Sequence, residues 1–155
     1  MKLNKKGFTL VELLAVIVVL AVIMVIAIPT VIDSMNSAKK NSFVMYGQKM
    51  ITAAMSKVQG DALDGVAAKS VYKFSELVAS SGQYKGYVSY SNGNYTVSFY
   101  NADYVASAVG YDELEQFKKA DCGSAQVPAI CGKVAAASDS TYSTKTGAID
   151  TQLSK

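Results

Sequence analysis

One carboxylate stands inside the longest apolar run of the sequence. Between Phe8 and Ile28 only Thr9 and Glu12 are polar. A carboxylate inside a membrane-spanning helix costs roughly 2.5–3.5 kcal/mol on insertion scales, and such residues usually have a partner. No lysine lies within the run, so the nearest cation would be a backbone amine created by cutting the chain between Gly7 and Phe8. Glu12 would then lie one helical turn from that amine, or within reach of the amine of a neighbouring chain, and such an ion pair can fix register.

Two cysteines, Cys122 and Cys131, are the next residues with distinctive chemistry. Two thiols without histidine partners cannot complete a structural zinc site. An even number of cysteines in an exported domain favours one disulfide, and the alternative is a pair of free, partly buried thiols. A disulfide between them would close a small loop that contains Pro128 and would contribute about 2–3 kcal/mol in the chain-entropy estimate.

An acidic run consists of Asp112, Glu113 and Glu115. It could suggest calcium binding, but it lacks the alternating oxygen ligands of a known calcium loop. A solvated helix face is therefore the favoured interpretation. We predict no metal site and no cofactor for this chain.

The composition disfavours enzymes and sequence-specific nucleic-acid binding. All 15 basic residues are lysine, and the sequence contains no Arg, His or Trp. Arg is the best bidentate reader of phosphate and guanine, and His is the usual general base, so neither recognition nor a Ser-His-Asp or Cys-His mechanism is expected. The sequence also lacks a nucleophile motif and a glycine-rich phosphate loop. An enzyme or small-molecule binding module on a membrane anchor is therefore disfavoured, and we predict no catalytic residue.

The element that positions Glu12 is an apolar helix long enough to span a bilayer. As a helix, the run from Phe8 to Ile28 would be about 30 Å long, the thickness of the hydrocarbon core. The lysines before it predict a cytoplasmic N-terminus, with the rest of the chain outside. A cleavable secretory signal has a shorter apolar region and a small-residue cleavage site, and a plain signal anchor leaves Glu12 unexplained.

Residues 6–13, Lys-Gly-Phe-Thr-Leu-Val-Glu-Leu, resemble the processing site of type IV pilins and the related pseudopilins. The likeness includes a short basic leader, Gly before the cut, Phe as first mature residue, Glu as fifth and an unbroken apolar helix. Pro29 also stands where that family often places a helix-kinking proline. The resemblance implies that a prepilin peptidase cleaves after Gly7 and that Phe8 becomes the N-methylated mature N-terminus. It also implies that Glu12 pairs with the N-terminal amine of an adjacent subunit during assembly.

The resemblance further implies an α+β pilin fold. In this fold a long N-terminal helix, membrane-spanning in its first half, packs by its second half on a small antiparallel β-sheet. The expected parts are a cleaved leader (1–7), a transmembrane or filament-core helix half (8–30) and a globular part (31–155) that includes an amphipathic helix half (31–59). In many pilins a disulfide near the C-terminus pins the last segment to the sheet.

Beyond Pro29 the pattern changes from apolar all round to apolar on one side. Pro29 removes a backbone donor and is expected to kink or loosen the helix. Gly60 and Asp61 are predicted to end it near Gln59. The residues that recur at helical spacing on one face are Ile32, Met35, Phe43, Tyr46, Met50, Ala54 and Val58.

The clearest β signal is a hairpin within residues 84–101, because two alternating runs flank Asn92-Gly93. Six of the ten tyrosines lie in residues 84–104, where sheet faces are the favoured explanation and an adhesive surface is the alternative. The tail, residues 138–155, shows only weak periodicity. The other expected elements are a loop at 60–68, short helices at 75–81 and 112–119, and a third strand at 104–109.

Together these features favour a structural subunit of a type IV pilus. Such a subunit is inserted in the cytoplasmic membrane as a prepilin with a cytoplasmic N-terminus. It is then processed by prepilin peptidase and polymerised by the pilus assembly platform. The product is an extracellular homopolymer used for adhesion, motility or biofilm formation. The alternative is a pseudopilin of a type II secretion or competence DNA-uptake system, which shares residues 1–30. Major secretion pseudopilins usually carry a calcium loop near the C-terminus, and no such loop is found in this sequence. The ordinary size of the chain, without insertions, favours a major pilin over a minor one.

Overall fold

The computed structural model describes residues 8–120, 122 and 127–155. The chain divides into two compact units, one ending at Ala38 and one running from Lys39 to Lys155. We call the second unit the head. Helix α1 (Leu10–Leu63) contributes its beginning to the first unit and its remainder to the head, which contains all the described strands.

The buried face of α1 begins at Phe43. Six residues spaced three or four apart, or adjacent, are fully or almost fully covered, as an amphipathic helix requires: Phe43, Val44, Gly47, Met50, Ile51 and Ala54. The predicted apolar stripe is therefore confirmed in the second half of the helix. It is wrong at Ile32 and Met35, which belong to the first unit and are 52% and 57% exposed.

The end of α1 lies at Leu63, four residues beyond the predicted end. Gly60 does not stop the helix, and the ion pair between Lys57 and Asp61 (2.7 Å) adds a small stabilisation to the turn that contains it. Termination comes instead at Gly65, whose φ is +71°. The Gly65 N–H donates to Ala62 O, and the next residue's N–H donates to Asp61 O at 2.8 Å. These two bonds form a Schellman motif.

The sheet has five antiparallel strands in the order β1-β2-β3-β4-β5. The predicted hairpin is confirmed, because Asn92 and Gly93 connect β2 to β3 with φ of +49° and +84°. Positive φ at both central residues matches a type I′ turn, which suits the twist of the flanking strands. The third strand is confirmed too. The strands are β1 (Val71–Lys73), β2 (Lys85–Ser91), β3 (Asn94–Tyr100), β4 (Tyr104–Val109) and β5 (Val134–Ala136).

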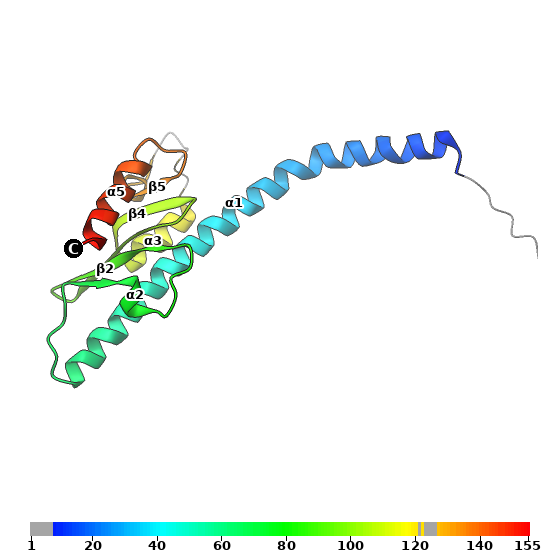
Figure 1. Ribbon diagram of the computed structural model, residues 1–155. Coiled ribbons are helices and arrows are strands. Elements are labelled where there is room, and N and C mark those ends of the chain that lie inside the picture. Colours follow the sequence, from blue (N-terminus) through cyan, green and yellow to red (C-terminus); the bar gives the residue numbers. More distant parts are fainter. Residues whose placement is uncertain (1–7, 121, 123–126) are drawn as a thin grey trace, which may run out of the picture. The chain divides into compact units, whose positions relative to one another are not determined.

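Each face of the sheet packs against a different helix (Figure 1). Val97 and Phe99 of β3 join the α1 cluster, where the Phe43 and Phe99 rings stack with centroids 4.2 Å apart. On the opposite face, helix α5 (Tyr142–Leu153) places Ile149 against a second, smaller cluster that includes Tyr100. Tyrosines therefore pack on both faces, as the sheet interpretation predicted: Tyr84, Tyr95 and Tyr104 on the α1 side, Tyr87 and Tyr100 on the α5 side.

A β-bulge shifts the register between β3 and β4. Val97 pairs with Val109 and Phe99 pairs with Ala106, so β4 contains one extra residue between these pairs. Ala108 takes the left-handed conformation there, with φ of +50°, and its N–H donates to Ser98 Oγ at 2.8 Å. The shift turns Val109 into the α1 cluster, where strict alternation would have turned it away.

The remaining helices are short. Helix α3 (Tyr111–Lys119) confirms the predicted helix at 112–119, while α2 (Phe74–Leu77) is shorter than the predicted segment at 75–81. Helix α4 (Ile130–Lys133) and α5 were not predicted. The Ser/Thr-rich sequence of α5 buries Ile149 alone among its described residues, so periodicity gives almost no signal.

Candidate assembly site

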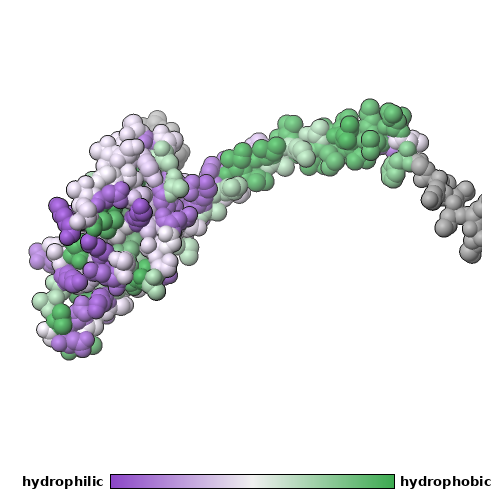
Figure 2. Space-filling view, in the orientation of Figure 1, coloured by the Kyte–Doolittle hydropathy of each residue, from purple (hydrophilic) through white to green (hydrophobic). Residues whose placement is uncertain are grey.

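The first unit exposes a helix surface that is apolar all round up to Pro29 apart from Glu12 near its start. Every side chain from Phe8 to Ala38 is exposed, and the large hydrophobic ones range from 85% at Phe8 to 49% at Leu20. Figure 2 shows this segment hydrophobic along almost its whole length. By length and composition, α1 is the one described helix able to cross a membrane. A helix that is apolar all round requires lipid or other protein around it.

Glu12 has local hydrogen-bond partners at the start of this helix. The Thr9 N–H and the Thr9 hydroxyl both donate to Glu12 Oε2 at 2.8 Å. The Glu12 N–H in turn approaches Thr9 Oγ1 at 3.3 Å. Thr9 precedes the first helical residue, Leu10, so these contacts form a capping box with Thr9 as the N-cap and Glu12 at the third helical position.

The capping box was missed in the sequence, although the pattern Thr-x-x-Glu before an apolar run is its usual signature. It supplies donors to the carboxylate but no positive charge. Phe8 lies immediately before Thr9, so an amine created at Phe8 would form beside the same carboxylate. Gly7 lies outside the described residues, and the roles of Gly7, Phe8 and Glu12 in processing, methylation and assembly remain predictions.

Pro29 lies inside α1, and the helix continues through it. The Thr30 hydroxyl donates to Ala27 O at 2.8 Å, and the Ser34 hydroxyl donates to Thr30 O at 2.9 Å. Hydroxyls that bond back to the preceding turn compete with the backbone ladder and often bend helices. A kink at Pro29 remains a prediction that these contacts favour.

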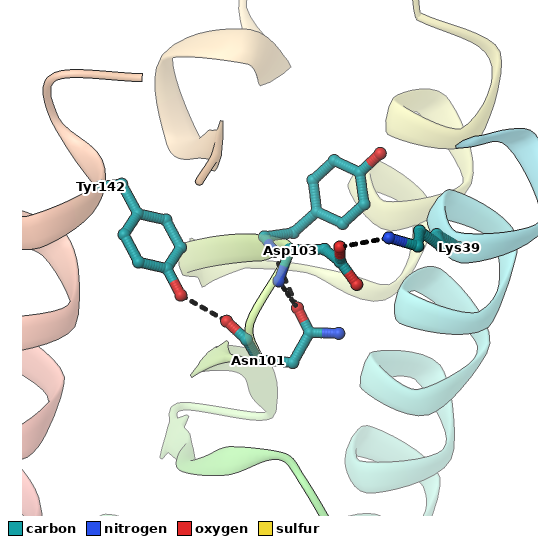
Figure 3. A network of polar contacts seen from close by, with 5 residues as sticks. Lys39, Asn101, Asp103 and Tyr142 are labelled. Atoms are coloured by element: carbon teal, nitrogen blue, oxygen red, sulfur yellow. Dashed lines mark hydrogen bonds and ion pairs between the residues drawn. The ribbon is translucent and has the colours of Figure 1, made fainter. Parts of the chain in front are cut away.

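A polar network connects α1 to the turn between β3 and β4 within the head (Figure 3). Lys39 Nζ lies 2.7 Å from the Asp103 carboxylate, which raises the pKa of Lys39 through hydrogen bonding and charge. The buried Asn101 side chain accepts from the N–H groups of Asp103 and Tyr104 at 3.0 and 2.8 Å. This arrangement fixes the turn that presents Asp103 to the helix.

The same network reaches α5 through Tyr142. Its hydroxyl donates to Asn101 O, and burial, with a smaller contribution from Asp103, raises the pKa of Tyr142. Through Asp103 and Asn101, the network therefore joins three segments of the head that are distant in sequence: α1, the turn between β3 and β4, and α5. Because the Asn101 side-chain oxygen and backbone groups are hydrogen-bonded and the residue is only 5% exposed, the network positions elements rather than offering a reactive group.

The two cysteines are joined in the structure. Cys122 and Cys131 form a disulfide with Cα atoms 5.7 Å apart, and Cys131 packs against the α1 cluster. The bond thereby ties the segment before α4 to the core of the head.

The acidic run lies within α3, with Asp112 and Glu113 in the first turn of the helix. Glu113 accepts from the Gly110 N–H at 2.9 Å and pairs with Lys133, and these contacts lower the pKa of Glu113. Glu115 lies 3.9 Å from Lys118. The described residues contain no group of three candidate metal ligands. The run is thus engaged in a helix cap and ion pairs, as expected of a solvated helix face.

Comparison with known families finds a match for the N-terminal segment. The family model of the prokaryotic N-terminal methylation motif matches residues 2–28. This motif is the class III signal of type IV pilins, and here it precedes a long apolar helix. No curated protein and no solved structure gives a significant match to the chain.

The motif and the fold agree. The motif indicates the type IV pilin-like or pseudopilin class, whose members are structural proteins rather than catalysts. The long helix followed by a five-stranded antiparallel sheet is a pilin-like α+β architecture. A motif of this type implies processing by prepilin peptidase, insertion of the unprocessed form in a membrane and assembly into filaments.

Proposed function

We propose that this chain is a structural subunit of a type IV pilus. Prepilin peptidase cleaves after Gly7, Phe8 becomes the N-methylated mature N-terminus, and residues 8–30 leave the cytoplasmic membrane for the filament core. The assembly platform polymerises the subunits into an extracellular homopolymer that serves adhesion, motility or biofilm formation. Residues 31–155, stapled by Cys122–Cys131, form the filament's outer part.

The observation that carries this proposal is the combination of an exposed apolar helix half with an acid at its start. Glu12 forms a capping box with Thr9 and has no ion pair with any residue that the structure describes. In a bundle of such helices, the Phe8 amine of an adjacent subunit would supply the missing charge. The Thr9 bonds have one ionised partner, the carboxylate, whereas the neighbour's amine would bring an opposite charge, and this attraction is strong where the surroundings have a low dielectric constant.

A pseudopilin of a type II secretion or competence system is the second candidate. The methylation motif favours a pseudopilin as much as a pilin, because both classes carry the motif that matches residues 2–28. The two candidates differ in product: a pilin yields long filaments that can be sheared from the surface, whereas a pseudopilin acts within an envelope machine. Recovery of the chain from sheared surface material therefore distinguishes them.

The test is mass spectrometry of sheared filaments from cells producing the wild-type chain. We expect an N-terminus at Phe8 carrying one methyl group. A chain that still begins at Met1 in the membrane fraction, without filaments, contradicts the proposal.

Two matched variants separate the charge of Glu12 from its capping role. Glu12→Gln keeps an acceptor for the Thr9 donors but removes the charge, whereas Thr9→Val keeps the charge and removes the capping hydroxyl. We expect filaments to be lost with Glu12→Gln and Glu12→Ala and retained at reduced yield with Thr9→Val. Wild-type filament yield from Glu12→Gln would contradict the assembly role of the charge.

A further inference from the structure

The head exposes two separate apolar patches. Large hydrophobic side chains are exposed at only five described positions of the head: Met45, Leu63, Val66, Tyr111 and Val127. Met45 and Tyr111 line one surface groove along the second half of α1, which we call the α1 groove, together with Lys49 and Thr52. Leu63 and Val66 form the second patch, at the turn after α1, which we call the loop patch.

The loop patch is held in a defined conformation. The Schellman motif fixes the backbone from Asp61 to Val66 through two hydrogen bonds and a left-handed glycine. Leu63 is nevertheless 90% exposed and Val66 56% exposed. A rigid turn that presents apolar side chains loses little entropy when it is covered, which favours a docking role.

The two patches carry opposite unpaired charges. Lys49 is exposed in the α1 groove and forms no ion pair with any other described residue. Asp64 is exposed in the loop patch and forms no ion pair within the described part of the chain. Lys57 is paired with the neighbouring Asp61, and Asp64 makes only the smallest contribution to the raised pKa of Lys57. Each patch therefore combines two apolar side chains with one available charge, and the charges are complementary.

We propose that the loop patch of one copy of this chain docks in the α1 groove of the next copy. Leu63 and Val66 cover Met45 and Tyr111, and Asp64 pairs with Lys49. The copies are parallel in the proposed filament, so docking of the loop patch in the α1 groove of the next copy is a heterologous contact that can repeat along the filament. Lys49 and Leu63 are 14 residues apart on α1, so parallel copies are offset by about 20 Å along the helix.

This contact rests on the proposed filament, to which it adds a specific interface between heads. Around a two-fold axis the same two patches could pair reciprocally, but such a contact joins antiparallel copies and closes as a dimer. The parallel copies of the proposed filament give the repeating contact instead, and the two arrangements differ in product, because only the repeating one links more than two copies.

The test is cysteine cross-linking in sheared filaments of the full chain. Filaments are prepared from cells producing Lys49→Cys alone, Asp64→Cys alone, both variants together, or the double variant, and are then oxidised and separated without reductant. We expect dimers only when the two variants are mixed and a ladder of multimers from the double variant. Peptide mapping confirms that the new bond joins positions 49 and 64. Lys119→Cys, an exposed position on α3, replaces Lys49→Cys as the matched control and should give no ladder.

Intact filaments without the 49–64 bond, or dimers from either single variant alone, would overturn the interface while leaving the filament itself established. Absence of wild-type filaments would instead overturn the proposed function.

If the cysteine variants fail to assemble, exchanging the charges at positions 49 and 64 tests the interface instead. We expect Lys49→Asp and Asp64→Lys each to lower filament yield several-fold and the double exchange to restore it. Failure of the double exchange to restore yield would contradict the pairing.

Discussion

The two halves of α1 form one continuous helix but bury very different amounts of side chain. Between Leu10 and Ala38 no side chain is covered, although nearly every residue up to Pro29 is apolar. Between Lys39 and Leu63 a narrow stripe is fully covered, although lysines, glutamines and serines surround it. Hydrophobicity alone therefore does not decide burial in this chain. Periodicity does, because only a one-sided stripe can face a sheet and leave a solvated back.

The two halves also differ in their packing partners. The stripe of the second half is matched by Val97, Phe99 and other sheet residues of the same chain. The first half has no such partner among the described residues.

Separating the halves should give the largest effect. A chain of residues 39–155 retains every described buried residue, so we expect it to be soluble, monomeric and folded. The full chain should require detergent, because its first half exposes an apolar surface long enough to span a bilayer. Size-exclusion chromatography and circular dichroism check this, and a head that aggregates or loses its thermal transition would contradict the division.

Truncating one large side chain in each half sharpens the comparison. Phe43→Ala removes a fully buried ring that stacks on Phe99, so we expect a loss of about 3–5 kcal/mol in the free energy of unfolding. Ile23→Ala, at a position 55% exposed, should leave the stability of the head unchanged. Denaturant unfolding of both variants in detergent measures the difference. Equal losses would show that the first half also supports the head.

Two glycines of α1 test the packed face at finer scale. A Cβ at Gly47 would lie 2.8 Å from the Phe99 ring and from Leu114 Cδ1, whereas a Cβ at Gly60 meets nothing within 4 Å. Ala gains about 1 kcal/mol over Gly in a helix, and overpacking costs about 1–3 kcal/mol. We therefore expect Gly47→Ala to destabilise the head by about 1 kcal/mol and Gly60→Ala to stabilise it by up to about 1 kcal/mol. Thermal unfolding that shifts in the same direction for both would contradict this.

The smallest effect concerns alkaline pH and reports on the head alone, because residues 8–38 contain no tyrosine. Burial and a hydrogen bond to Asp150 raise the pKa of Tyr100 to about 12. An unfolded tyrosine releases its proton near pH 10, so the folded state binds more protons between those values and stability falls as pH rises from about 10 to 12. We expect Tyr100→Phe to lessen this fall, as measured by urea unfolding at pH 9 and 11.5. An unchanged pH dependence would contradict the shift.

The sequence predicted those elements whose signals are local. The Asn92-Gly93 turn demands positive φ, and the alternating runs beside it have no other simple explanation, so the hairpin was predictable. The buried face of α1 was predictable from Phe43 onward for the same kind of reason. Pairings between distant segments were not, because nothing local in α5 indicates that Ile149 covers the far face of the sheet. The bulge at Ala108 was not predictable either, because alanine rarely adopts a left-handed conformation and nothing in the sequence marks this position as an exception.

The assembly site was half predictable. The cost of Glu12 in an apolar helix identified the residue and its need for a cation. Its immediate contacts come from Thr9 and were not predicted, because the cost of a buried carboxylate indicates a missing charge and not a particular hydrogen-bond donor. The network around Asn101 could not be foreseen, because it depends on where α5 places Tyr142.

The shortness of the outermost strands has a consequence for crowding. Strands β1 and β5, which flank the sheet, contain three residues each. An open sheet edge is a template on which another chain can add a strand, and long flat edges lead to aggregation and amyloid. Edges this short offer few backbone donors and acceptors for such growth. Many heads can therefore be held at high local concentration without fusing their sheets, and contacts among them are left to side chains.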